Sequence, residues 1–142
     1  MYKNLLKYFI VIFIIQGVTV AQSDLSKRLY DKYSNYIFSE IETKRFSHAD
    51  LMDALSKFED SDLINISSAG VSVEGREIKL IKIGTGKTNV MAWSQMHGDE
   101  STATMALMDF LNFVETEDEF TELKAEIFKK ITLYIIPMLN PD

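Results

Sequence analysis

The stretch NVMAWSQMHGDESTATMALMDFLNFV, residues 89–114, decides the fold class of this chain. Residues 89–94 form a short apolar run of the kind expected for a buried strand. Residues 96–101 are a polar break, and residues 102–114 then repeat apolar side chains at helical spacing. We expect one face of this helix to carry Ala103, Ala106, Leu107, Phe110, Leu111 and Val114. A strand followed closely by a helix indicates an α/β protein.

The flanking segments extend this pattern into a sheet. Residues 120–130 predict another helix, and residues 131–137, ITLYIIP, predict a second buried strand. Upstream, residues 63–73 and 76–83 predict two strands joined at Glu74-Gly75 as an antiparallel hairpin. We therefore expect a mixed, largely parallel sheet covered on both faces. No segment closes the second edge of this sheet, which suggests a piece of a larger one.

Two helices are predicted before the sheet. Residues 25–38 place leucine and tyrosine side chains along a helical stripe. Ser47 and Asp50 have the spacing of a capping box and start a second helix that we expect to end near Glu59.

The first residues have the pattern of a secretion signal. Lys3 and Lys7 precede the apolar run YFIVIFII at residues 8–15, and small side chains lead to Ala21. A membrane anchor is the alternative, but a span needs about 20 apolar residues and this run is shorter. We expect residues 1–21 to be a cleaved signal peptide and residues 22–142 to be a secreted or periplasmic domain with no membrane attachment.

Composition narrows the possible functions. The net charge of −6 argues against nucleic acid as a partner, because phosphate binding requires clustered lysine and arginine. The chain has no cysteine, which excludes disulfides, thiolate metal sites and cysteine nucleophiles. Any metal ion must therefore be held by histidine, aspartate or glutamate, and there are only two histidines, His48 and His97.

His97 and Glu100 are the candidate metal ligands. They follow the predicted strand at residues 89–94, and ligands bind beyond the carboxyl ends of parallel strands. Imidazole and carboxylate are both good zinc ligands, and Gly98 lets the turn between them bend. The alternative is structural: His97 could donate a hydrogen bond within a loop, and Glu100 could complement the following helix dipole. We expect His48 to be a surface residue.

The segment MAWSQMHGDESTAT, residues 91–104, closely resembles the zinc-binding stretch of the M14 metallocarboxypeptidases, in particular bacterial members with HGNE or HGDE. Two more segments resemble family motifs in the same order. VEGREI at residues 73–78 is similar to the preceding hairpin, and IIPMLNPD at residues 135–142 is similar to a family strand and its Asn-Pro-Asp turn. The resemblance extends from about Phe46 to Asp142.

The resemblance implies a three-layer α/β/α fold and one zinc ion per complete domain, held by His97, Glu100 and a second histidine. It implies hydrolysis of peptide or protein substrates at or near their C-termini. The second histidine, the general base and the groups that bind the substrate carboxylate lie beyond Asp142 in the family pattern. We therefore expect residues 22–142 to be the N-terminal part of such a domain, with no catalytic residue of its own and little activity alone.

Two other functions fit parts of the pattern. Zinc deacylases of the aspartoacylase and succinylglutamate desuccinylase type also use a His-Gly-x-Glu site, although the signal sequence and the Asn-Pro-Asp turn favour the peptidase. A non-catalytic extracytoplasmic binding module is the third possibility. Substrate preference and oligomeric state are left open by the sequence.

Overall fold

The computed structural model describes residues 24–39 and 46–142. The predicted signal peptide, residues 1–21, lies outside the described residues. The chain divides into two compact units, Met1–Asn35 and Tyr36–Asp142.

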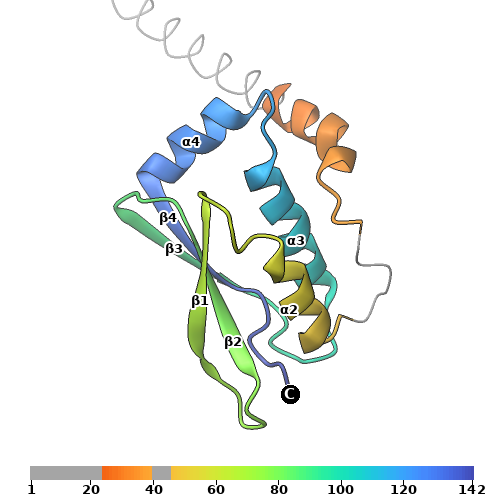
Figure 1. Cartoon of the computed structure of the whole chain (residues 1–142). Coiled ribbons are helices and arrows are strands. Elements are labelled where there is room, and N and C mark those ends of the chain that lie inside the picture. Colours follow the sequence, from red (N-terminus) through yellow and green to blue (C-terminus); the bar gives the residue numbers. More distant parts are fainter. Residues whose placement is uncertain (1–23, 40–45) are drawn as a thin grey trace, which may run out of the picture. The chain divides into compact units, whose positions relative to one another are not determined.

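The described part of the first unit is helical. An α-helix covers residues 24–32 and is followed by the short 3-10 helix η1, Tyr33–Asn35 (orange in Figure 1). Lys27 and Asp31 form an ion pair of 2.8 Å at the i,i+4 spacing that supports a helix. The prediction of one helix over residues 25–38 was therefore too long. Phe38 belongs to the second unit, where its backbone N–H donates to Asp109 Oδ1 at 2.7 Å.

Helix α2, His48–Ser56, is the first α-helix of the described part of the second unit. Its capping box is as predicted: the Asp50 N–H donates to Ser47 Oγ at 3.2 Å, and the Ser47 N–H donates to Asp50 Oδ2 at 2.8 Å. The helix ends at Ser56, and turns follow through residue 60, so it is shorter than predicted.

Strands β1, Ile64–Val71, and β2, Glu77–Ile83, form the predicted antiparallel hairpin. Their register runs from the pair Ile64–Ile83 to the pair Val71–Glu77 and shifts between Ser68 and Gly70. Gly75 has a φ of +80°, a conformation that glycine adopts without steric cost, and it allows the turn between the strands.

Strands β3, Thr88–Trp93, and β4, Ile131–Ile136, pair in parallel. Helices α3, Thr102–Glu115, and α4, Thr121–Lys130, connect them, as a parallel crossover requires. β4 also pairs antiparallel with β2, so the strand order is β1-β2-β4-β3. The predicted mixed sheet is confirmed, with β4 inserted between the hairpin and β3. A largely parallel sheet was expected, but among the described strands only the β3–β4 pairing is parallel.

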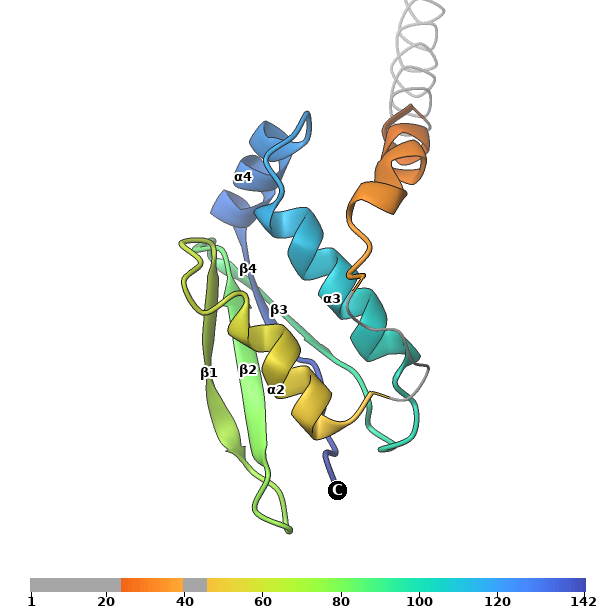
Figure 2. The same cartoon turned by 45° about the vertical axis from the view of Figure 1, so that its right-hand side comes forward.

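The hydrophobic core lies between one face of the sheet and helices α2 and α3, which Figures 1 and 2 show on the same side of the strands. Residues at alternate positions of the strands point into it, because successive strand residues face opposite sides. Its fully buried members include Leu51 of α2, Ile81 and Ile83 of β2, Met108 and Leu111 of α3, and Ile135 of β4.

Two expectations about burial were wrong. β3 is an edge strand rather than a buried one, and its Met91 and Trp93 side chains are 50% and 52% exposed. In helix α3, Ala103 and Ala106 are exposed, and the buried side is formed by Thr104, Met108, Leu111 and Val114. In the described part of the second unit, helices cover one face of the sheet, so the outward residues of β3 meet solvent.

Among residues 24–39 and 46–142, no helix combines the length and apolar character needed to span a membrane.

Candidate zinc-binding turn

The candidate site is the turn of residues 95–100, between the end of β3 and the start of α3. The last strand residue is Trp93, and the Ser94 N–H then donates to Ile136 O of β4 at 3.0 Å. The turn therefore leaves the sheet at the carboxyl end of a parallel strand pair, where ligands bind in open α/β sheets.

The turn brings the two predicted ligands together. His97 Nδ1 lies 3.0 Å from Glu100 Oε2, and the Glu100 N–H donates to His97 O at 3.0 Å, which closes the backbone turn. The two side chains are 69% and 67% exposed, so both are open to solvent. Both side chains can therefore be reached by an ion that approaches from solvent.

These two donors fit a zinc ion. Two ligand atoms at about 2.1 Å from a tetrahedral ion are about 3.4 Å apart, close to the 3.0 Å between His97 Nδ1 and Glu100 Oε2. A separation of the side chains by a few tenths of an ångström would admit the ion. Within the described residues, however, no group of three or more His, Asp or Glu side chains could hold a metal. The turn itself brings together two such donors, His97 and Glu100.

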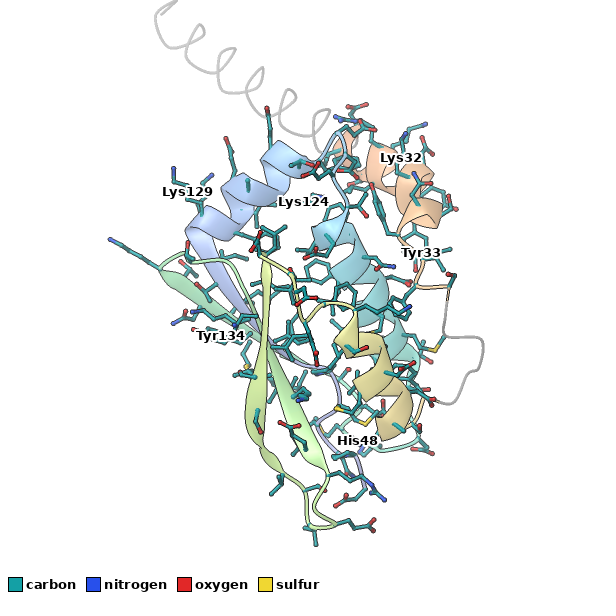
Figure 3. All side chains as sticks on the ribbon, viewed as in Figure 1. Lys32, Tyr33, His48, Lys124, Lys129 and Tyr134 are labelled. Carbon is teal, nitrogen blue, oxygen red and sulfur yellow. The ribbon has the colours of Figure 1, made fainter. Side chains whose placement is uncertain are left out.

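His48 does not join this pair. It lies at the start of α2 (labelled in Figure 3), is partly buried, and its Nε2 donates to Glu77 O at 2.8 Å. The expectation of a surface residue was thus only partly correct, since the ring helps to fasten α2 to the first residue of β2.

A buried polar cluster lies between the turn, helix α3 and the segment after β4. Ser94 Oγ donates to Pro137 O at 2.5 Å, and Thr104 Oγ1 lies 3.0 Å from Ser94 Oγ and 2.8 Å from Pro137 O. Thr104 Oγ1 also donates to Gln95 Oε1 at 2.9 Å. Among the described residues, no buried side-chain nitrogen or oxygen lacks a hydrogen-bond partner. Sequence patterns did not reveal this cluster, because isolated Ser, Gln and Thr have no characteristic spacing.

The structure also joins two of the segments that resemble family motifs. Arg76, just before β2, donates from Nη1 to Asp142 Oδ1 at 2.9 Å and to Pro141 O at 3.0 Å. The Ser72 hydroxyl donates to Asp142 Oδ1 at 2.6 Å, and the Glu74 N–H donates to Asp142 Oδ2 at 3.0 Å. The Ser72 hydrogen bond and the neighbouring Arg76 charge lower the pKa of Asp142, because both favour the carboxylate.

A hollow of about 410 Å³ lies beside the turn. Its wall is formed by the turn of residues 95–100, by helix α2 and by the Arg76–Asp142 pair. The residues that line it include Phe46, His48, Arg76, Gln95, Gly98 and Asp142. Its volume is in the range of small-molecule sites.

Comparisons with known proteins agree on one family. Residues 49–142 match the sequence model described as zinc carboxypeptidase. A carboxypeptidase B from Astacus astacus is 30% identical over 88 residues, which cover 57% of this chain and 27% of the relative. The chain thus spans about a quarter of the length of that relative.

Solved structures show the same fold. A metallo-carboxypeptidase from Burkholderia cenocepacia is similar with a TM-score of 0.57 and 23% identity over 66% of this chain and 27% of the other. A protein described as a carboxypeptidase A, from Shewanella denitrificans, has a TM-score of 0.57 and 22% identity over 68% of this chain and 26% of the other. Together with the family match over residues 49–142, these comparisons show that the chain belongs to the zinc carboxypeptidase family, M14.

Proposed function

We propose that His97 and Glu100 are two of the three protein ligands of a catalytic zinc ion, in an enzyme that hydrolyses peptide bonds at or near the C-terminus of its substrate. The observation that carries this proposal is the 3.0 Å approach of His97 Nδ1 to Glu100 Oε2 on a solvent-open turn within the family match. The zinc, when bound, supplies Lewis acidity and an activated water.

The residues of this chain have a defined share in that chemistry. His97 and Glu100 would hold the metal ion, and the exposure of both side chains leaves room for a third ligand and for water. The hollow lined by Arg76 and Gln95 lies next to the turn and offers space for a bound peptide segment. We expect this chain by itself to bind zinc weakly and to have little turnover, because two ligands do not complete a catalytic site.

Zinc titration tests the assignment. We expect Zn²⁺ to bind the chain at one equivalent and His97→Ala and Glu100→Ala each to weaken binding at least tenfold. His48→Ala is the matched control, because it removes the other histidine but leaves the turn unchanged. Equal zinc affinity in wild type and His97→Ala would disprove the ligand assignment. The second test is hydrolysis of a peptide with a C-terminal reporter. If this chain alone hydrolyses it in a chelator-sensitive way, a third zinc ligand from outside these residues is not needed.

We also propose that residues 1–21 direct export and are removed, so that the protein acts outside the cytoplasm. The support is the basic start, the apolar run at residues 8–15 and the small side chains before Ala21. N-terminal sequencing of the protein recovered from the culture medium or periplasm should give Gln22 as the first residue. Recovery of an intact N-terminus in the membrane fraction would favour the anchor instead.

A further inference from the structure

Gln95 has a backbone conformation that is uncommon for its residue type. Its φ is +46°, in the left-handed region, and it is the one non-glycine residue with a positive φ among those described. A side chain in this region is sterically disfavoured and persists where surrounding contacts fix it. Gln95 directly precedes the Met96–Glu100 part of the turn, so its conformation sets the direction in which the turn leaves the sheet.

The Gln95 side chain is buried, at 4% exposure, and its amide is used at both ends. Nε2 donates to Gly98 O at 2.7 Å and to Phe46 O at 3.3 Å. Oε1 accepts from Thr104 Oγ1 of helix α3 at 2.9 Å. The backbone carbonyl of Gln95 also accepts from the Asn140 N–H at 3.0 Å. One residue therefore ties the ligand turn to α3, to the segment before α2 and to the segment after β4.

The contact with Gly98 is the one that bears on the metal. Gly98 lies between His97 and Glu100, and a Cβ added at this position would make only ordinary contacts, at 3.6 Å and beyond, so no close packing surrounds this part of the turn. The ligand side chains are largely exposed and add little packing. Where packing is weak, the partly buried hydrogen bond from Gln95 Nε2 to Gly98 O is the contact that holds the turn backbone in position.

We infer that Gln95 is a positioning residue for zinc: its amide holds the His97–Glu100 turn in the conformation in which both donors face one ion. This inference rests on the proposed function. A turn that is already ordered before the metal arrives does not have to lose conformational freedom on binding, which raises affinity. Residues that orient metal ligands typically change metal affinity 10- to 100-fold when they are replaced.

The test uses the full chain and Zn²⁺ alone. Gln95→Met keeps the length of the side chain but removes both ends of the amide. Gln95→Gly removes the side chain and also relieves the positive φ, so that at least one variant keeps a folded backbone. Thr132→Val is the matched control: Thr132 is also buried and donates to a glycine carbonyl, Gly86 O at 2.7 Å, in a different loop.

Two measurements are made on each folded variant. One is the dissociation constant for Zn²⁺. The other is the exchange rate of the Glu100 amide hydrogen in metal-free protein, measured by NMR, because this N–H closes the turn onto His97 O. We expect both Gln95 variants to bind Zn²⁺ at least 10-fold more weakly and to exchange the Glu100 amide at least 10-fold faster. Thr132→Val should change neither.

The outcomes separate the inference from the function on which it rests. Unchanged affinity and unchanged exchange in a folded Gln95 variant would overturn the inference. Equal losses in Thr132→Val would overturn it too, because the effect would then be one of general stability. If wild type binds no Zn²⁺, the proposed function and the zinc part of the inference both fail, and the Glu100 exchange rate alone decides whether Gln95 holds the turn.

Discussion

Lys124 offers the sharpest test of how the second unit is held together. It is a lysine that is only 5% exposed, on helix α4. Its Nζ donates to Phe113 O at 2.8 Å and also to Thr116 O, two carbonyls at the C-terminal end of α3. A helix leaves its last carbonyls without partners in the helix, so this ammonium group satisfies acceptors that would otherwise be left unpaired. The same Nζ lies 3.4 Å from Asp118 Oδ1.

The replacement Lys124→Met keeps the aliphatic stem and removes the charge. Each hydrogen bond to a charged group contributes about 1.5–3 kcal/mol, and part of this is offset because the variant no longer buries an ammonium ion. We expect the free energy of unfolding to fall by about 3 kcal/mol. For a domain of about 100 residues, this loss lowers Tm by roughly 15 °C.

Urea unfolding followed by far-UV circular dichroism measures this loss as a shift in the midpoint at constant m value. Lys129→Met is the control, because Lys129 lies on the same helix but is exposed and points to solvent (Figure 3). Its effect should stay within about 0.5 kcal/mol. A loss below about 1 kcal/mol in Lys124→Met would refute the view that this lysine joins α4 to the end of α3.

Three further predictions follow from contacts in the second unit. Burial by itself raises the pKa of Asp118, but hydrogen bonds from the Tyr36 hydroxyl, at 2.5 Å, and from the backbone outweigh it and lower the pKa. The Asp118 carboxylate therefore stabilises the fold above its unfolded pKa, about 3.9, and this stability is lost as pH falls through the lowered folded pKa. Between pH 5 and about 3, the urea midpoint should thus drop more in wild type than in Asp118→Asn. Gly86→Ala should destabilise the protein by about 3 kcal/mol in the same urea assay, because its Cβ would lie 1.9 Å from Lys130 C. Gly75→Ala is the control: a Cβ at Gly75 meets no atom within 4 Å, so this variant should lose only the stability that the strain of its positive φ costs. Trp93→Lys should reduce concentration-dependent light scattering, since Trp93 is a 52% exposed apolar residue on an edge strand, and unchanged scattering would show that this edge does not drive association.

Much of the secondary structure could be predicted because it depends on neighbouring residues. The capping box of Ser47 and Asp50, the hairpin around Gly75 and the helix after the ligand turn all lie within a few residues of where the patterns place them. The predicted helix over residues 25–38 failed at its end for the opposite reason. Tyr36 and Phe38 are buried in the second unit by contacts with residues far away in the sequence, and the local apolar spacing does not predict such contacts.

The burial of β3 and the inward side of α3 were also beyond the reach of local patterns. An apolar run at residues 89–94 predicts a strand, but whether that strand is central or at an edge depends on which strand pairs beside it. Because β4 lies between β2 and β3, β3 is left at the edge with Met91 and Trp93 exposed. In α3, Thr104 faces inward where Ala103 was predicted to do so. Its buried hydroxyl belongs to the polar cluster formed with Ser94, Gln95 and Pro137 O.

The sequence by itself determined the family and the identity of the candidate ligands. His97 and Glu100 are three residues apart after a strand, and short-range spacing is enough to bring two such donors together. Only the tertiary structure decided what holds their turn in place. The Gln95 amide reaches Gly98, Phe46 and Thr104, and such bonds between separate segments exist only after the sheet and helices have packed and removed these polar groups from water.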